Sequence, residues 1–196
     1  EIEAITTAVL SFNADKVGEP LLAHLKEPDI VKNGHRLVKQ YNCQGCHQIE
    51  NRGGQLVNII SAPEYAPPNL NSEGRKAQPD WLLSFFNNPS IIRPNLQVRM
   101  PSFHQIPDKE WNTIIRYFQY IDSEKISYRG EFAFDNNSTE YHAGEKLHEL
   151  GACNNCHFYG ETFPTQEAST WAPNLAMTKE RLNPEWVKEF LRDPQI

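Results

Sequence analysis

Apolar residues recur at helical spacing in several separate stretches of the chain. A helix with this spacing buries one apolar face against a neighbouring element. Two of the stretches are bounded by prolines: one begins at Pro79 and ends before Pro89, and the other begins at Pro184 and ends before Pro194. Proline is common at the first position of a helix and just after its end. The pattern predicts an all-α fold. The predicted helices cover residues 1–12, 30–41, 79–88, 107–123, 141–150 and 184–193.

A short motif occurs twice, and similar residues follow each copy in the same order. Cys43-Gln44-Gly45-Cys46-His47 returns 110 positions later as Cys153-Asn154-Asn155-Cys156-His157. Each copy is followed by a Pro-Asn-Leu run, which begins at Pro68 and at Pro173, and by a helix with tryptophan, at Trp81 and at Trp186. A phenylalanine four residues after each tryptophan shares its helix face. The repeat predicts two domains of similar structure.

The repeat also predicts where the domains begin and end. We expect an N-terminal helix and linker at residues 1–29, a first domain at residues 30–123, a polar linker at residues 124–137 and a second domain at residues 138–196. The counterpart of Met100 would lie beyond Ile196, so the second domain is expected to be incomplete at its C-terminus.

The helix at residues 1–12 has the apolar pattern of the helix that closes the first domain. We therefore expect it to be the last helix of a preceding domain, and the 196 residues to be part of a longer tandem array or to stop short of the true C-terminus. The alternative is an N-terminal extension that shares only its amphipathic pattern with that helix.

The repeated motif has the spacing of a covalent haem attachment site. In C-x-x-C-H, two thiols within one turn form thioethers to the haem vinyl groups, and the adjacent histidine supplies an imidazole to the iron. We therefore predict two covalent haem c groups, on Cys43, Cys46 and His47 and on Cys153, Cys156 and His157. The alternatives are zinc sites, which need four protein ligands, and disulfide pairs, which leave the histidines without a purpose.

The proline of each Pro-Asn-Leu run is a candidate partner for the adjacent motif's histidine. Proline has a fixed φ and no amide hydrogen, so it holds a loop with its carbonyl presented outward. A carbonyl that accepts the Nδ1 hydrogen of a ligating histidine fixes its tautomer and makes it more basic. We assign this role to Pro68 and Pro173; loop rigidity alone is the alternative.

Composition limits the partners and the compartment. The formal net charge of −6 argues against nucleic acid and weakly favours a basic protein partner. No apolar run is long enough to cross a membrane. Because haem is attached to such motifs after export, we expect a processed protein in the periplasm or on the outer face of the cytoplasmic membrane.

The ordered set of motifs resembles class I cytochrome c, well over residues 30–123 and in part over residues 138–196. The resemblance rests on the C-x-x-C-H motifs, the Pro-Asn-Leu runs, the tryptophan helices and Met100-Pro101 before a closing helix. It implies two tandem class I domains, with His47 and Met100 as the axial ligands of the first haem and His157 as a ligand of the second. Trp81 and Trp186 are assigned to the haem pockets.

The second copy departs from the family because its methionine loop is absent. Its distal ligand therefore stays open between a methionine beyond Ile196, Met177 and a histidine. Met177 aligns with Ser72 of the first copy, where a packing role is the simpler explanation. The histidine candidates are His24, His35, His104, His142 and His148.

The resemblance implies electron transfer rather than turnover of a substrate. The expected partners are other cytochromes or subunits of a membrane respiratory complex. We expect the chain to act either as an electron carrier or as a subunit of a larger multihaem assembly. One alternative is a dihaem peroxidase, in which the second haem has an open coordination position. Another is a structural or sensor role for the haem.

Overall fold

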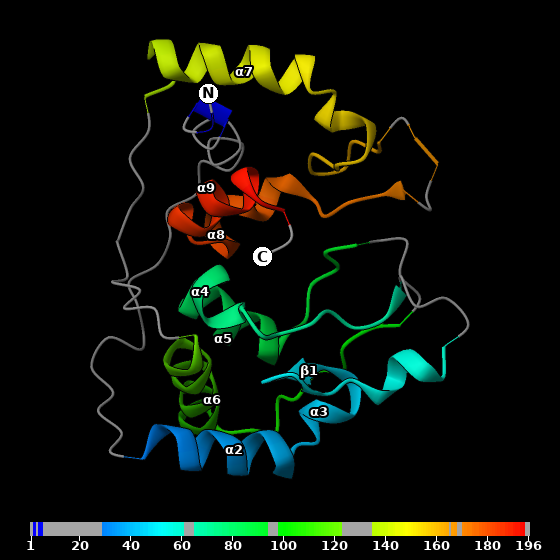
Figure 1. Cartoon of the computed structure of the whole chain (residues 1–196), viewed down its shortest axis with the longest axis vertical. Helices are drawn as coiled ribbons and strands as arrows, with labels where there is room; N and C mark the ends of the chain where they lie inside the picture. Colours follow the sequence, from blue (N-terminus) through cyan, green and yellow to red (C-terminus); the bar gives the residue numbers. More distant parts are fainter. Residues whose placement is uncertain are drawn as a thin grey trace. The chain divides into compact units, whose positions relative to one another are not determined.

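The computed structural model describes residues 2, 4–5, 29–60, 65–93, 98–122, 135–164, 166–167 and 170–194 of the chain. Its α-helices are α2 (Ile30–Gln40), α3 (Cys43–Cys46), α4 (Glu73–Lys76), α5 (Pro79–Asn87), α6 (Asp108–Ile121), α7 (Thr139–Leu150), α8 (Thr178–Arg181) and α9 (Pro184–Arg192) (Figure 1). Short 3-10 turns occupy Gln55–Asn58, Cys153–Asn155 and Leu175–Met177. The predicted helical class is confirmed.

Most of the predicted N-terminal helix and of both linkers lies outside the described residues. A small difference from the prediction is a two-stranded hairpin after the first motif, made of β1 (Gln48–Ile49) and β2 (Arg52–Gly53). None of the described helices is both long and apolar enough to cross a bilayer.

The chain divides into two compact units. One comprises Glu19–Ser90 and Leu96–Tyr128 and contains the first C-x-x-C-H motif; we call it the first-motif unit. The other comprises Glu1–Gly18, Ile91–Asn95 and Arg129–Ile196 and contains the second motif; we call it the second-motif unit.

The core of the first-motif unit forms where α2 crosses α6 (Figure 1). Gly34 of α2 faces Tyr117 of α6 so closely that a Cβ atom at position 34 would lie 2.3 Å from Cγ of the tyrosine ring. Tyr117 is fully buried, and Leu37 and Ile114 beside it are 1% exposed. The missing side chain at Gly34 therefore allows the two helices to approach.

Helix α5 adds an aromatic layer to this core. Pro79 is its first residue, and Asp80 lies in its first turn, where an acidic group is stabilised by the helix dipole. Trp81 stacks on Phe85, with ring centroids 4.7 Å apart, as their spacing of four residues predicts. Phe86 stacks on Trp111 of α6 at 4.3 Å, so α5 and α6 are joined through their aromatic faces.

The second-motif unit has helices at the corresponding places in the sequence. Helix α7 begins after Ser138, whose hydroxyl accepts a hydrogen bond from the backbone N–H of Tyr141. Helix α9 begins after Asn183, whose side chain accepts from the N–H of Glu185. Trp186 stacks on Phe190 at 4.9 Å, as Trp81 does on Phe85. Both helices thus carry caps that the sequence encodes locally.

The contact between Gly34 and Tyr117 predicts the effect of a substitution. Gly34→Ala adds a methyl group that overlaps a buried aromatic ring, so α2 and α6 must separate or Tyr117 must shift. We expect a loss of about 1–3 kcal/mol in the free energy of unfolding, measured by urea denaturation. Lys32→Ala, at an exposed position of the same helix, is the control. Equal stability of the two variants would show that the crossing has room for a methyl group.

Candidate functional site

The first C-x-x-C-H motif folds into one tight turn directly after α2. Asn42 precedes it in the left-handed conformation, with φ of 54°. The N–H of Gly45 donates to the carbonyl of Asn42 at 3.0 Å, and the N–H of His47 donates to the carbonyl of Cys43 at 2.9 Å. Both thiols and the imidazole therefore belong to a single hydrogen-bonded turn.

The imidazole of His47 is held by the Pro-Asn-Leu loop. Its Nδ1 lies 2.8 Å from the carbonyl oxygen of Pro68. Because a carbonyl only accepts, Nδ1 carries the hydrogen and Nε2 has a free lone pair. The N–H of Leu70 donates to the carbonyl of Gln48 at 2.9 Å, which joins the loop to the residue after the histidine.

Electrostatics favour the neutral form of His47. Burial lowers its pKa, while the hydrogen bond to Pro68 and the charge of Glu73 act in the opposite direction. A neutral imidazole whose Nδ1 is engaged presents Nε2 as a metal ligand. The residues around His47 therefore give it the protonation state that iron ligation requires.

Each hydrogen bond described for the first motif has a counterpart at the second motif. Ala152 has φ of 49°, and its carbonyl accepts from the N–H of Asn155 at 2.9 Å. The N–H of His157 donates to the carbonyl of Cys153 at 2.9 Å, and its Nδ1 lies 2.7 Å from the carbonyl oxygen of Pro173. The N–H of Leu175 donates to the carbonyl of Phe158 at 2.9 Å, which corresponds to the bond between Leu70 and Gln48.

The side chain of Asn174 links two segments of the second site by hydrogen bonds. Its Oδ1 accepts from the N–H groups of Gly160 at 3.1 Å and Ala176 at 3.0 Å, and its Nδ2 donates to the carbonyl of Gly160 at 2.9 Å. One side chain thus joins the turn that follows His157 to the loop that carries Pro173.

All four cysteines are free thiols. Burial raises the pKa of Cys43 to about 11 and also raises the pKa of Cys153, so both remain protonated near neutral pH. Within the described ranges, no three His, Cys, Asp or Glu side chains gather as a metal site. The structure therefore offers the zinc and disulfide alternatives no support in these residues.

The other predicted site residues lie apart from the motif turns in the sequence. Met100 and Trp81 are half-buried and pack against the core of the first-motif unit. Trp186 is 7% exposed on α9, and Met177 is half-buried at the end of a 3-10 turn. The roles of Met100, Trp81 and Trp186 toward a haem remain predictions.

The candidate histidines divide by their surroundings. His35 contacts Glu50 at 2.5 Å and His142 contacts Glu145 at 3.1 Å. His148 contacts the hydroxyl of Tyr159, and the exposed His104 lies 3.3 Å from the hydroxyl of Ser102. His24 lies outside the described residues.

Sequence reasoning missed the residues that shape the turns. Asn42, Ala152, Glu50 and Asn51 adopt positive φ, and they are the non-glycine residues that do so within the described part of the chain. Aligning the two motifs places Asn42 opposite Ala152, but only the backbone reveals their conformation. Asn174 and its counterpart Asn69 were visible in the repeated Pro-Asn-Leu run, although their hydrogen bonds were not expected.

In the first-motif unit, α2 leads into C-x-x-C-H and the later helix α6 crosses it, an arrangement similar to that of a c-type cytochrome domain. In particular, residues 29–118 match a protein-family model described as cytochrome c oxidase, cbb3-type, subunit III. This match supports a c-type cytochrome with haem-mediated electron transfer in a respiratory context. Searches of curated proteins and of solved structures gave no match.

The residues present fit haem c. Cys43 and Cys46 are unpaired thiols at the ends of a four-residue turn, and the tautomer of His47 leaves Nε2 for iron. The second motif has the same donors and the same tautomer at His157. A thioether-linked haem supplies one-electron chemistry, and the protein contributes its ligands and its apolar surroundings.

Asn174 provides a test of how the second site is held. Asn174→Ala removes three hydrogen bonds around Pro173, and we expect the free energy of unfolding of the second-motif unit to fall by roughly 1–3 kcal/mol. Urea denaturation followed by tryptophan fluorescence measures the loss. Asn154→Ala, at an exposed position between the two cysteines, is the control. Unchanged stability in Asn174→Ala would remove Asn174 from the support of this site.

Proposed function

We propose that the chain carries two covalent haem c groups and transfers electrons between respiratory redox proteins. The observation that carries the proposal is the identity of the two motif turns. In each turn, the backbone N–H of the histidine donates to the carbonyl of the first cysteine, and the Nδ1–H of its ring donates to the carbonyl of a proline. The same geometry at two places 110 residues apart supports the proposal that both turns hold the same group.

The domain organisation follows from this proposal. Two tandem class I cytochrome c domains occupy residues 30–123 and 138–196, with an N-terminal segment at 1–29 and a linker at 124–137. Cys43, Cys46 and His47 hold the first haem, and Cys153, Cys156 and His157 hold the second. The candidates for the distal ligand of the second haem are Met177 and a histidine.

Met100 is the proposed distal ligand of the first haem. It lies half-buried against the hydrophobic core, in the segment that leads into α6. A thioether sulfur opposite an imidazole keeps iron low-spin and raises its reduction potential relative to two imidazoles. Trp81, also packed against this core, contributes to an apolar pocket that excludes water from the haem.

The proposed partners are other cytochromes or membrane respiratory complex subunits on the outer side of the cytoplasmic membrane, in the periplasm. The family description of residues 29–118 supports this context. The net charge of −6 favours a basic docking surface on the partner. A peroxidase activity is not supported, because no comparison points to one.

Counting haems tests the proposal directly. Intact mass and the pyridine haemochrome spectrum of the exported chain should give two haems per polypeptide. We expect one haem in each of two matched variants, Cys43→Ala/Cys46→Ala and Cys153→Ala/Cys156→Ala, because each removes one pair of thioethers. A single haem in the wild-type protein would refute the second site. No haem at all would refute the function.

Ligation by Met100 predicts a change in the reduction potential. Met100→His replaces the thioether with a second imidazole, so the potential of the first haem should fall by an amount on the order of 0.2 V. The charge-transfer band between methionine sulfur and iron should also disappear from the oxidised spectrum. Met177→Leu serves as the control and should leave the first haem unchanged. An unaltered spectrum in Met100→His would exclude Met100 as the ligand.

A further inference from the structure

Glu50 adopts a backbone conformation that a glycine would adopt more readily. It is the first residue of the two-residue turn between β1 and β2, and its φ is 51°. Hairpin turns of this length require positive φ, which glycine, asparagine and aspartate tolerate best. At the corresponding position after the second motif the chain has Gly160, with φ of 63°. A non-glycine residue here costs about 1 kcal/mol, so the Glu50 side chain must make contacts that offset this strain.

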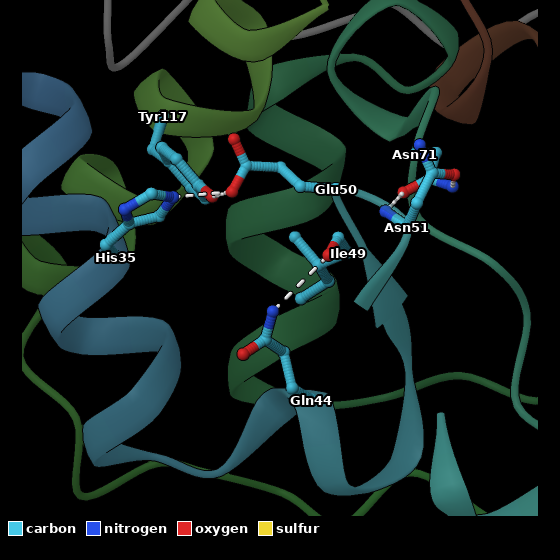
Figure 2. A network of polar contacts seen from close by, with 7 residues as sticks. All are labelled: His35, Gln44, Ile49, Glu50, Asn51, Asn71 and Tyr117. Carbon is cyan, nitrogen blue, oxygen red and sulfur yellow. Dashed lines mark hydrogen bonds and ion pairs between the residues drawn. The ribbon is translucent and has the colours of Figure 1, made fainter. Parts of the chain in front are cut away.

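The Glu50 carboxylate joins two helices that are distant from it in the sequence. His35 of α2 places Nε2 2.5 Å from Oε2, and the Tyr117 hydroxyl of α6 donates to the same oxygen at 2.9 Å. Figure 2 shows both side chains converging on Glu50. The second-motif unit has Glu145 at the position of His35 and Gly160 at the position of Glu50, so it lacks both members of this pair.

The surroundings of Glu50 favour its ionised form and the neutral form of Tyr117. Partial burial acts to raise the pKa of Glu50, but hydrogen bonds from His35 and Tyr117 and the charge of Arg52 hold it below its usual value. Burial raises the pKa of Tyr117, and the hydrogen bond to Glu50 adds to this effect. Glu50 is therefore ionised and Tyr117 neutral across the range in which histidine titrates.

Solvent reaches both members of the pair. The side chain of His35 is 43% exposed and that of Glu50 is 34% exposed. Because the carboxylate accepts, Nε2 of His35 carries a hydrogen, and an incoming proton binds at Nδ1. Proton exchange with water thus needs no opening of the core.

The hairpin that carries Glu50 is bonded to the elements that hold His47. Glu50 lies three residues after the histidine, and the amide of Gln44 in the motif turn donates to the carbonyl of Ile49 at 3.3 Å. Asn51 and Asn71 exchange two hydrogen bonds, Asn51 N–H to Oδ1 of Asn71 at 3.0 Å and Asn71 Nδ2 to Oδ1 of Asn51 at 2.8 Å (Figure 2). The charged pair therefore has a fixed position relative to the first motif turn.

We propose that His35 and Glu50 form a proton-binding site coupled to reduction of the haem at His47, an inference that rests on the proposed function. One electron from a redox protein converts ferric to ferrous iron and lowers the local charge by one. One proton from water forms an N–H bond at Nδ1 of His35 and restores that charge. Lower positive charge at the iron favours the imidazolium, and protonated His35 in turn raises the reduction potential.

The test uses the full-length haem protein in redox titrations between about pH 5 and pH 8, the range of histidine titration. The titration of the first haem is recognised as the one whose reduction potential changes in Met100→His. We expect its potential to fall as pH rises in the wild-type protein. It should depend much less on pH in His35→Gln, which keeps an amide donor for Glu50 but cannot take up a proton. Glu50→Gly, which installs the residue of the second copy and relieves the backbone strain, should weaken the dependence in the same direction.

His142→Gln is the matched control, because His142 forms an exposed pair with Glu145 in the second-motif unit. It should leave the pH dependence of the first haem intact. NMR titration of the His35 imidazole gives a second readout, and its proton affinity should be several-fold higher in the reduced protein. Equal affinity in both states, or an unchanged pH dependence in His35→Gln, would overturn this inference while the haem count leaves the proposed function standing. If no haem is attached, both fail.

Discussion

The site depends on one hydrogen bond, which occurs twice, between a histidine Nδ1 and a proline carbonyl. It selects the tautomer in which Nε2 is free, and it does so with a backbone acceptor that no side-chain substitution can remove. Proline suits the position because its fixed φ holds the loop and it has no amide hydrogen to satisfy. The lowered pKa of His47 acts in the same direction, since a buried neutral imidazole is the form that binds a metal.

The parts of the fold that repeat or follow a short period were predictable from the sequence. Helices α5 and α9 begin at Pro79 and Pro184 as expected, and the aromatic residues four positions after the tryptophans stack on them. The pairing of His47 with Pro68 follows from the chemistry of proline and of a ligating imidazole. Local propensity and periodicity are sufficient for such features because the residues involved are close in the sequence or occur twice.

The sequence does not reveal contacts between residues far apart that occur only once. Tyr117 and Glu50 are 67 residues apart, and no periodic pattern links them. The conformation of Ala152 was equally hidden, because alanine has no preference for positive φ, whereas Asn42 at the same place does tolerate it. The hairpin was expected as a loop, since strands of two residues are too short to show an alternation of polar and apolar positions.

Backbone strain in the described residues occurs close to the two C-x-x-C-H motifs. Within the described residues, positive φ at non-glycine positions occurs at Asn42, Glu50, Asn51 and Ala152, each within four residues of a C-x-x-C-H motif. Strain persists only where the surrounding contacts compensate for it. Asn42 and Ala152 lie where a helix turns directly into the motif, which explains their strain in both units. The turn at Glu50 does not require a side chain, because Gly160 occupies the corresponding position after the second motif. The backbone strain at Glu50 is therefore compensated by the hydrogen bonds of its carboxylate.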